Sequence, residues 1–259
     1  MQKKINIGAL ISGSGTNLQA IIDACEKSTI DGQMVFVGSD NPEAKGLERA
    51  VKHNIPHFVV DYTHIMKRHQ SDPLPEDYNP DDIYEKQCIF SKTKHDQKKV
   101  IQLLNTRVMA ERALLDQMAQ YHFDLLVLAG YMRNLTPYFI DRINTDKDHP
   151  RIMNIHPALL PAFPGTDGYG DTFKYGCKVG GCTVHFIDYG EDSGPIIGQK
   201  CFAITPQDTE DSIRKKGLAL EWELYPECIQ LFAENRLKIQ VNQNKHDSLW
   251  KNRTNVIIK

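Results

Sequence analysis

The stretch Ile5-Asn-Ile-Gly-Ala-Leu-Ile11, followed at once by Ser12-Gly-Ser-Gly-Thr-Asn17, decides the fold class of this chain. The first part is a short and nearly continuous apolar run, which is typical of a strand buried on both faces. The second part is a glycine-rich turn, and Thr16 or Asn17 can cap the helix that the apolar spacing after it predicts. A strand, a tight turn and a helix in this order indicate the first unit of an α/β sheet.

The same alternation of strands and helices continues along the chain. Further strands are predicted at 34–38, 56–60, 123–129 and 151–155, and a late pair at 182–187 and 195–204. Helices are predicted at 43–53, 97–121 and 209–235, with a short one that opens at Thr136-Pro137. We therefore predict an α/β, Rossmann-like fold: a mostly parallel twisted sheet with helices on both faces and a late antiparallel strand pair.

Residues 62–95 interrupt this alternation, because they are rich in His, Asp, Lys and Pro and have no sustained period. We interpret them as a surface insertion with a short helix near 81–90. The chain is then predicted to be one domain over residues 1–237 that carries the insertion. A polar C-terminal tail at 238–259 follows, and its pattern assigns no structure.

Composition excludes several classes of partner. A formal net charge of −2 gives no general field that would attract nucleic acid or an anionic membrane, so we expect neither. Six cysteines form no CxxC pair, and a chain of 259 residues needs no disulfide framework. We therefore expect reduced thiols and a cytoplasmic location. The sequence leaves a homodimer open.

The glycine-rich turn is a candidate phosphate site, because free N–H groups and the positive end of a helix meet there. A turn that merely needs two glycines for tight bending explains the pattern equally well. Dinucleotide binding is disfavoured, since its fingerprint requires glycine where this chain has Leu18. The candidate residues are Gly13, Ser14, Gly15, Thr16 and Asn17.

The most specific motifs lie later in the chain. They are Leu126-Val-Leu-Ala-Gly-Tyr-Met-Arg133, Met153-Asn-Ile-His-Pro-Ala-Leu-Leu-Pro161, Phe163-Pro-Gly165, and Thr183-Val-His-Phe-Ile-Asp-Tyr-Gly-Glu-Asp-Ser-Gly-Pro195. Together they resemble the formyltransferase family that uses 10-formyltetrahydrofolate, and Ile11-Ser-Gly-Ser-Gly-Thr-Asn-Leu-Gln19 is similar to its glycinamide ribonucleotide branch. The resemblance runs from Ile5 to Leu237 outside the insertion, with the motifs in family order. It implies transfer of a formyl group from 10-formyltetrahydrofolate to the amine of glycinamide ribonucleotide in de novo purine biosynthesis, without a metal.

The resemblance also implies catalytic roles. Asn154 and His156 would bind the formyl oxygen, and Asp192 would orient the histidine and manage protons. The chemistry independently needs such groups, because an amide N–H and a protonated imidazole stabilise the negative charge that develops on that oxygen. A nearby carboxylate favours the protonated imidazole. Taken singly, each residue could instead be structural, and we interpret His185 as a packed structural histidine.

Other residues resemble those that contact the two substrates. Arg107 resembles an arginine that meets the glutamate tail of the folate, although a solvated helix residue explains it equally well. Glu221 resembles the acid that binds the ribose hydroxyls of the nucleotide. The insertion either covers the folate entrance or builds an oligomer contact. The segment expected to line the pterin pocket is Met132, Arg133, Asn134 and Leu135.

Two departures from the family pattern affect the acceptor site. The family often has a histidine soon after Pro164-Gly165, whereas this chain continues Thr166-Asp-Gly-Tyr-Gly-Asp171. Leu218 stands where a polar residue usually assists the phosphate. Arg214 lies two helical turns before Glu221 on the same face, so we expect it to replace that contact, with a solvated arginine as the alternative.

Rival functions fit less well. Formyltetrahydrofolate deformylase would use the same three residues to hydrolyse the donor, but it carries a further regulatory domain, which we do not expect before Ile5. Methionyl-tRNA formyltransferase needs a basic C-terminal domain, for which the roughly twenty residues after Leu237 are too few. Another formyl transferase that acts on a phosphorylated amine stays open. Leu18 argues against an oxidoreductase, and the catalytic set argues against a purely binding module.

Overall fold

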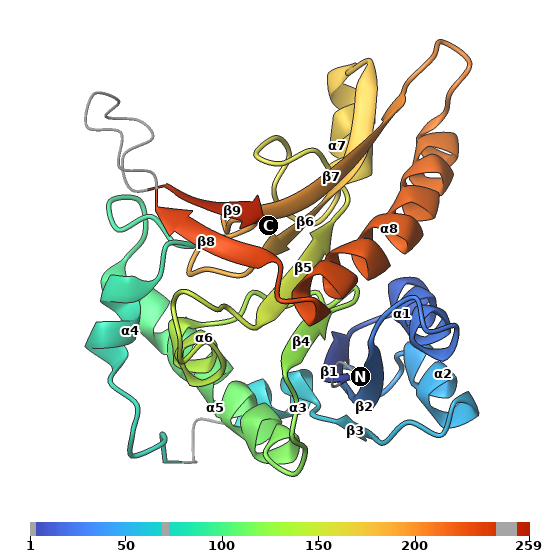
Figure 1. Ribbon diagram of the computed structural model, residues 1–259. Helices are drawn as coiled ribbons and strands as arrows, with labels where there is room; N and C mark the ends of the chain where they lie inside the picture. The colour runs from blue at the N-terminus through green and yellow to red at the C-terminus, as the bar shows by residue number, and fades with distance from the viewer. Residues whose placement is uncertain (1–3, 69–72, 242–252) are drawn as a thin grey trace.

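A seven-stranded sheet forms the centre of the computed structural model, which describes residues 4–68, 73–241 and 253–259 (Figure 1). The strand order is β3-β2-β1-β4-β5-β6-β7. Pairing is parallel from β3 through β5, and β6 and β7 are antiparallel to their neighbours, which confirms the predicted fold class. The strands are β1 (Ile5–Ile11), β2 (Gly32–Ser39), β3 (His57–Val59), β4 (Leu125–Leu128), β5 (Ile152–His156), β6 (Val179–Phe186) and β7 (Ile196–Ala203).

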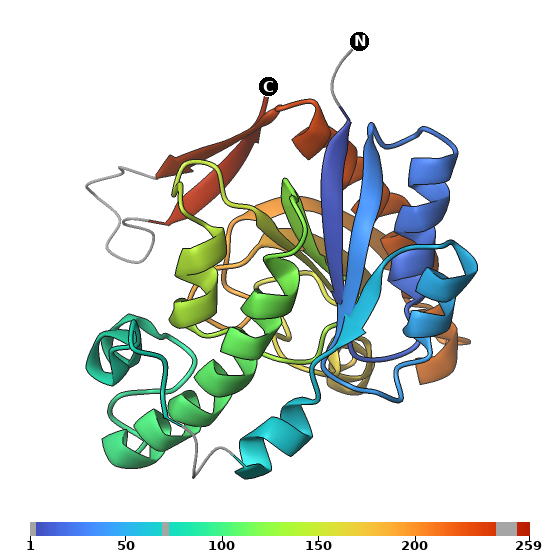
Figure 2. The same cartoon turned by 90° about the horizontal axis from the view of Figure 1, so that it is seen from below.

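Helices cover both faces of this sheet, as Figure 2 shows. One face packs against α1 (Thr16–Glu26), α2 (Gly46–Lys52) and α8 (Glu210–Ala233). The opposite face packs against α3 (Tyr62–Arg68), α5 (Gln97–Met118) and α6 (Pro137–Ile143). The period of two along β1 explains the two layers, because Ala9 and Ile11 enter the first core while Leu10 enters the second.

The strand order reverses direction at β1, which lies between β2 and β4. In open α/β sheets, ligands bind beyond the carboxyl ends of the strands at such a switch point. The chain leaves β1 into the glycine-rich turn and leaves β4 into Gly130, so both segments reach this edge of the sheet. The topology therefore sets the position of a site before any side chain is considered.

The start of α1 corrects one prediction. Gly15 precedes the helix in the left-handed region, with φ of 68°, and no side chain caps the first turn. Thr16 is already the first helical residue, so neither it nor Asn17 stands at the capping position. The side-chain amide of Asn17 instead donates a hydrogen bond to Glu221 on α8.

The predicted insertion contains more structure than expected. The short helix is present as α4 (Pro80–Lys86), but α3 was not predicted, and Tyr62 at its start is 2% exposed. Tyr78 and Tyr84 are also buried, in a cluster with α5. Large aromatic residues thus supply core contacts although the segment lacks periodicity.

Two further elements were not predicted from the sequence. Helix α7 (Gly168–Tyr175) lies in the segment that departs from the family pattern. The tail contains β8 (Leu237–Val241) and β9 (Thr254–Ile258), which pair as an antiparallel hairpin, with Ile239 and Val256 packed on the core. Within the described residues, no helix combines the length and apolar character that crossing a membrane requires.

Candidate active site

A cavity of about 340 Å³ opens beyond the carboxyl ends of β4 and β5. Segments that are distant in sequence meet around it: the start of α1, the chain after β4, the end of β5, the loop after β6 and one face of α8. The predicted residues that line it are Thr16, Asn17, Met132, Arg133, Asn134, Leu135, Asn154, His156, Asp192, Arg214 and Glu221. Gly13, Ser14, Gly15 and Arg107 are not among its lining residues.

The three predicted catalytic side chains converge at this cavity. Asn154 and His156 are two residues apart on β5, so their side chains share one face of the sheet. Asp192 comes from the loop after β6, and its Oδ2 lies 3.2 Å from Nδ1 of His156. Asp192 has a positive φ of 49°, and its carboxylate accepts a 2.8 Å hydrogen bond from the Gly165 N–H. The predicted convergence is therefore confirmed.

His185 lies beside both Asn154 and Asp192. It is opposite Asn154 in the antiparallel pairing of β5 with β6, and it is completely buried, in agreement with a structural histidine. Its Nε2 lies 3.2 Å from Nδ2 of Asn154 and 3.6 Å from Oδ1 of Asp192, while Nδ1 lies 2.9 Å from the carbonyl oxygen of Phe186. A proton on Nδ1 leaves Nε2 as the acceptor for the Asn154 amide, which fixes that amide. No local sequence pattern indicates this link, because it depends on strand register.

Burial and charge act in opposite directions on the catalytic histidine. Burial lowers the pKa of His156 below its ordinary value, and the opposing effects of Asp192 and of the Phe163 carbonyl do not offset it. The expectation that Asp192 keeps this imidazole protonated is therefore corrected for the resting site. Both ring nitrogens nonetheless face oxygen atoms, since Nε2 lies 2.8 Å from the Phe163 carbonyl oxygen. An imidazolium that forms during a reaction would find both of its N–H groups bonded.

Asp192 is held in its ionised form. Burial alone would raise its pKa, but its interactions with His185, with His156 and with the Gly165 N–H outweigh burial and lower the pKa. A stable carboxylate beside a neutral imidazole is the arrangement that lets the imidazole accept a proton. The pair is therefore suited to proton transfer.

Glu221 closes the cavity on the α8 side. Its Oε2 accepts a 2.7 Å hydrogen bond from Nδ2 of Asn17, and its Oε1 accepts one of 2.6 Å from the hydroxyl of Tyr169. Burial raises the pKa of Glu221, and these two bonds oppose the rise. Gly217 leaves the space for Tyr169, since a Cβ there would lie 2.1 Å from Cζ of the ring. Sequence reasoning missed Tyr169, which lies in the segment that departs from the family pattern.

Arg214 lines the cavity as predicted, but its positive charge is already paired with carboxylates. Its guanidinium forms ion pairs with Asp167 and with Glu210. Leu218 also lines the cavity and offers no polar atom. A phosphate at this end would therefore share Arg214 with two carboxylates.

The segment expected to contact the pterin is anchored to the glycine-rich turn. Nε of Arg133 donates to Oδ2 of the buried Asp40, and the Ser12 hydroxyl donates to Oδ1 of the same carboxylate. The Met132 N–H in turn donates a 2.9 Å hydrogen bond to the Ser12 hydroxyl oxygen. Asp40 was not identified from the sequence, because its partners lie far along the chain.

Arg107 is not the solvated residue that the sequence left as an alternative. It is half-buried on α5, and burial lowers the pKa of its guanidinium. Its guanidinium lies 5.7 Å from the ring centre of Phe90, and Nη1 is buried without a hydrogen-bond partner among the described residues. A buried donor of this kind favours an anionic or carbonyl partner supplied by a ligand.

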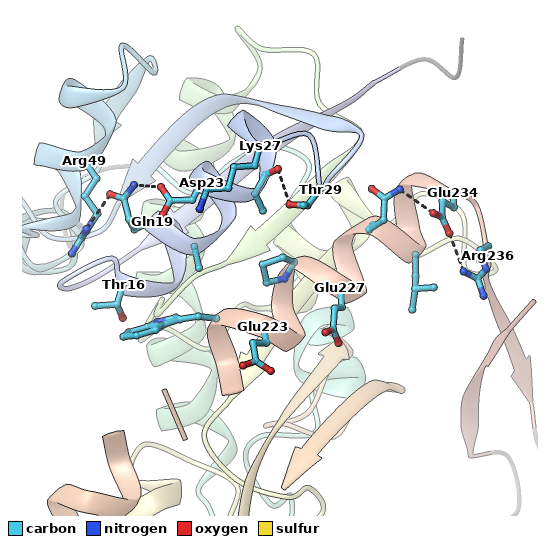
Figure 3. Close-up of a pocket in the computed structure, with 16 residues that line it drawn as sticks. Thr16, Gln19, Asp23, Lys27, Thr29, Arg49, Glu223, Glu227, Glu234 and Arg236 are labelled. Carbon is cyan, nitrogen blue, oxygen red and sulfur yellow. Dashed lines mark hydrogen bonds and ion pairs between the residues drawn. The ribbon is translucent and has the colours of Figure 1, made fainter. Parts of the chain in front are cut away.

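Two other observations delimit the site. A larger hollow of about 870 Å³ lies between α1 and α8, and Figure 3 shows that charged side chains line it. It shares only Thr16 with the cavity described above and includes none of the three catalytic candidates. In the part of the chain that the structure describes, no three His, Cys, Asp or Glu side chains form a group that could hold a metal ion.

Comparison with known proteins gives a consistent result. The family model described as formyl transferase matches residues 5–229. The chain is 32% identical over 219 residues to the phosphoribosylglycinamide formyltransferase of Bacillus subtilis (strain 168), which covers 85% of this chain and 90% of that protein. It is also 32% identical over 238 residues to the Escherichia coli (strain K12) protein of the same name, covering 92% of each. Among solved structures, glycinamide ribonucleotide transformylase 1 from Symbiobacterium toebii is 35% identical with a TM-score of 0.72, covering 100% of this chain and 95% of that one.

Proposed function

This chain belongs to the formyl transferase family, and we propose that Asn154, His156 and Asp192 carry out the chemistry of the transfer. The enzyme moves the formyl group of its cosubstrate, 10-formyltetrahydrofolate, to the amine of glycinamide ribonucleotide in de novo purine biosynthesis. The observation that carries the proposal is the meeting of these three side chains in one cavity with the start of α1 and the segment after β4. One cavity thus adjoins a candidate phosphate turn and a candidate folate segment.

The reaction needs one bond to form and one to break. The neutral amine attacks the formyl carbon, and the formyl oxygen gains negative charge as the new C–N bond forms. Asn154 uses one amide hydrogen toward His185 and has a second that can donate to that oxygen. Collapse of the intermediate breaks the bond to the folate nitrogen, which gains a proton while the amine loses one.

We assign the movement of that proton to His156 and Asp192. The lowered pKa of His156 favours a neutral imidazole that can accept the proton from the attacking amine. The ionised Asp192 at 3.2 Å then stabilises the imidazolium, which can return the proton to the leaving nitrogen. Asp192 therefore acts as the partner of the imidazole through charge, and His156 acts as the acid and base.

For the acceptor, we propose that the phosphate binds the N–H groups of the glycine-rich turn, Gly13 to Asn17, with Arg214 as a further contact. Glu221 would accept hydrogen bonds from the ribose hydroxyls. For the donor, we propose that Arg107 meets the glutamate tail and that Met132, Arg133, Asn134 and Leu135 line the pterin pocket. The buried Nη1 of Arg107, which has no hydrogen-bond partner in the described part of the chain, supports the first of these donor contacts.

The domain assignment is a proposal of the same kind. Residues 1–237 would form one formyltransferase domain, with 62–95 as an insertion in it and 238–259 as a tail that folds back on the core. Of these ranges, residues 1–3, 69–72 and 242–252 lie outside the described residues.

We also propose a cytoplasmic location, which the free thiols of all six cysteines support. A homodimer is the alternative to a monomer, and sedimentation velocity would decide between the two.

The assay that tests the function follows tetrahydrofolate release from 10-formyltetrahydrofolate with and without glycinamide ribonucleotide. We expect turnover only when the acceptor is present. Release without the acceptor would instead identify hydrolysis of the donor, and no release in either case would refute formyl transfer from this folate.

A further inference from the structure

The glycine-rich turn is held on one side through its carbonyl groups. The Gly46 N–H donates a 2.9 Å hydrogen bond to the Gly13 carbonyl, and Nε of Arg49 donates one of 3.0 Å to the Ser14 carbonyl. Nδ2 of Asn41 donates to the carbonyl of Ser12 at 3.2 Å. All three donors come from α2 or the segment that leads into it, so these hydrogen bonds hold the turn through its carbonyl oxygens.

This arrangement fixes where the N–H groups of the turn point. In a trans peptide group the C=O and the N–H point in opposite directions. Clamping the Gly13 and Ser14 carbonyls toward α2 therefore directs the N–H groups of Ser14 and Gly15 away from it. No residue of α2 lines the cavity, whereas Thr16 and Asn17 do. Within the described ranges, the N–H groups of residues 13–17 donate no hydrogen bond.

Close approach of α2 depends on two glycines. A Cβ at Gly15 would lie 2.8 Å from Cα of Gly46, and Gly15 has a positive φ of 68°. A Cβ at Gly46 would lie 2.6 Å from Cδ1 of Ile11 and 3.2 Å from the Gly13 carbonyl oxygen. The backbones are therefore packed closely enough for Arg49 to reach a main-chain carbonyl, although α2 itself is short.

We propose that Arg49 is a positioning residue for the acceptor phosphate, which acts through the Ser14 carbonyl rather than by touching the ligand. The inference rests on the proposed function, in which the turn binds that phosphate. A charged donor on the carbonyl polarises the peptide group that supplies the Gly15 N–H, so it strengthens that N–H as a donor to an anion. Arg49 thereby provides positive charge on the far side of the turn, while Arg214 on the cavity side is already paired with two carboxylates.

A purely structural role makes a different prediction. Nη1 of Arg49 also donates a 3.0 Å hydrogen bond to Oε1 of Gln19, which links α2 to α1, as Figure 3 shows. If Arg49 mattered only as this link, replacing Gln19 would have the same effect as replacing Arg49. Gln19→Leu is therefore the control for the link, and Lys52→Met is the control for loss of one positive charge from α2.

The test measures steady-state kinetics for both substrates in the full-length enzyme and the three variants. Arg49→Met should raise KM for glycinamide ribonucleotide about tenfold, the loss expected for one charged hydrogen bond, with KM for the folate within twofold of wild type. Gln19→Leu and Lys52→Met should leave both values within twofold. An unchanged acceptor KM in Arg49→Met, or an equal rise in Gln19→Leu or Lys52→Met, would overturn the inference.

A second measurement keeps the proposal independent of folding and of the assay. Titrating wild type with inorganic phosphate should shift the 15N–1H signals of Ser14 and Gly15, and Arg49→Met should require a several-fold higher concentration. Equal midpoints in the two proteins would overturn the role of Arg49. If wild type itself shows no acceptor-dependent turnover, the proposed function fails instead, so the two failures are distinguishable.

Discussion

The hydroxyl of Tyr169 donates a 2.6 Å hydrogen bond to Oε1 of Glu221, a residue 52 positions away on another helix. Tyr169 lies in α7, and Glu221 lies on the face of α8 that closes the cavity. Burial raises the pKa of this carboxylate, and the bond opposes that rise. The segment 166–171, which departs from the family pattern, thus supplies a hydrogen-bond partner for Glu221, which matches that pattern.

Tyr169→Phe should therefore weaken binding of the acceptor. The Tyr169 bond lowers the pKa of Glu221, so its loss raises that pKa further and leaves less carboxylate at a given pH. We expect KM for glycinamide ribonucleotide to rise several-fold and to increase on acidification from a higher pH than in wild type. KM profiles that superimpose over the whole pH range would contradict this role.

The acidic limb of the activity profile should report on His156. Its lowered pKa places loss of the neutral imidazole below about pH 6.5. Asp192, Glu191 and the Phe163 carbonyl raise this pKa while burial and His185 lower it, so Asp192→Asn should move the limb to lower pH. The measurement is kcat/KM against pH on wild type and on the residual activity of the variant. A limb that moves to higher pH would contradict the assignment of His156 as the base.

Arg214→Ala tests the replacement of the contact that is absent at Leu218. KM for glycinamide ribonucleotide should rise about tenfold and KM for the folate should stay nearly constant, because only one substrate carries the phosphate. Lys215→Ala removes the same charge from an exposed neighbour on α8 and is the matched control. Similar effects on both substrates, or no effect, would show that the ion pairs of Arg214 with Asp167 and Glu210 are structural.

Two tyrosines of the insertion separate its roles. The ring centre of Tyr62 lies 5.5 Å from the guanidinium of Arg133, which belongs to the segment expected to contact the pterin. Tyr84 instead lies in a separate cluster that packs on α5. Tyr62→Leu should raise KM for the folate several-fold, and Tyr84→Leu should lower the melting temperature without changing KM. A folate KM that responds equally to both variants would indicate that the insertion acts only through stability.

Much of the fold could be predicted because it depends on local pattern. The apolar run of β1, the turn after it and the long α5 are each visible in a short window of sequence. The meeting of Asn154, His156 and Asp192 followed from the resemblance. The structure confirms where these elements and these three side chains lie.

The remaining features depend on contacts between distant residues. Helix α7 contains Gly168 and Gly170, which disfavour a helix locally, and Tyr169 within it packs on α8. Strands β8 and β9 are separated in the sequence by residues 242–253, so no short turn motif signals their pairing. Asp40 and His185 matter through partners that only the strand order brings near. Their roles could not be derived from spacing along the chain.

The most direct test compares formyl transfer to glycinamide ribonucleotide by wild type, Asn154→Ala, His156→Ala and His149→Ala under one set of conditions. His149 is an exposed histidine that pairs with Asp146 on the surface and serves as the control. We expect kcat to fall by about two to three orders of magnitude in the first two variants, because Asn154→Ala loses a donor to the developing oxyanion and His156→Ala loses the acid and base, and to stay unchanged in the control. Near-normal kcat in a correctly folded Asn154→Ala or His156→Ala enzyme would contradict the account.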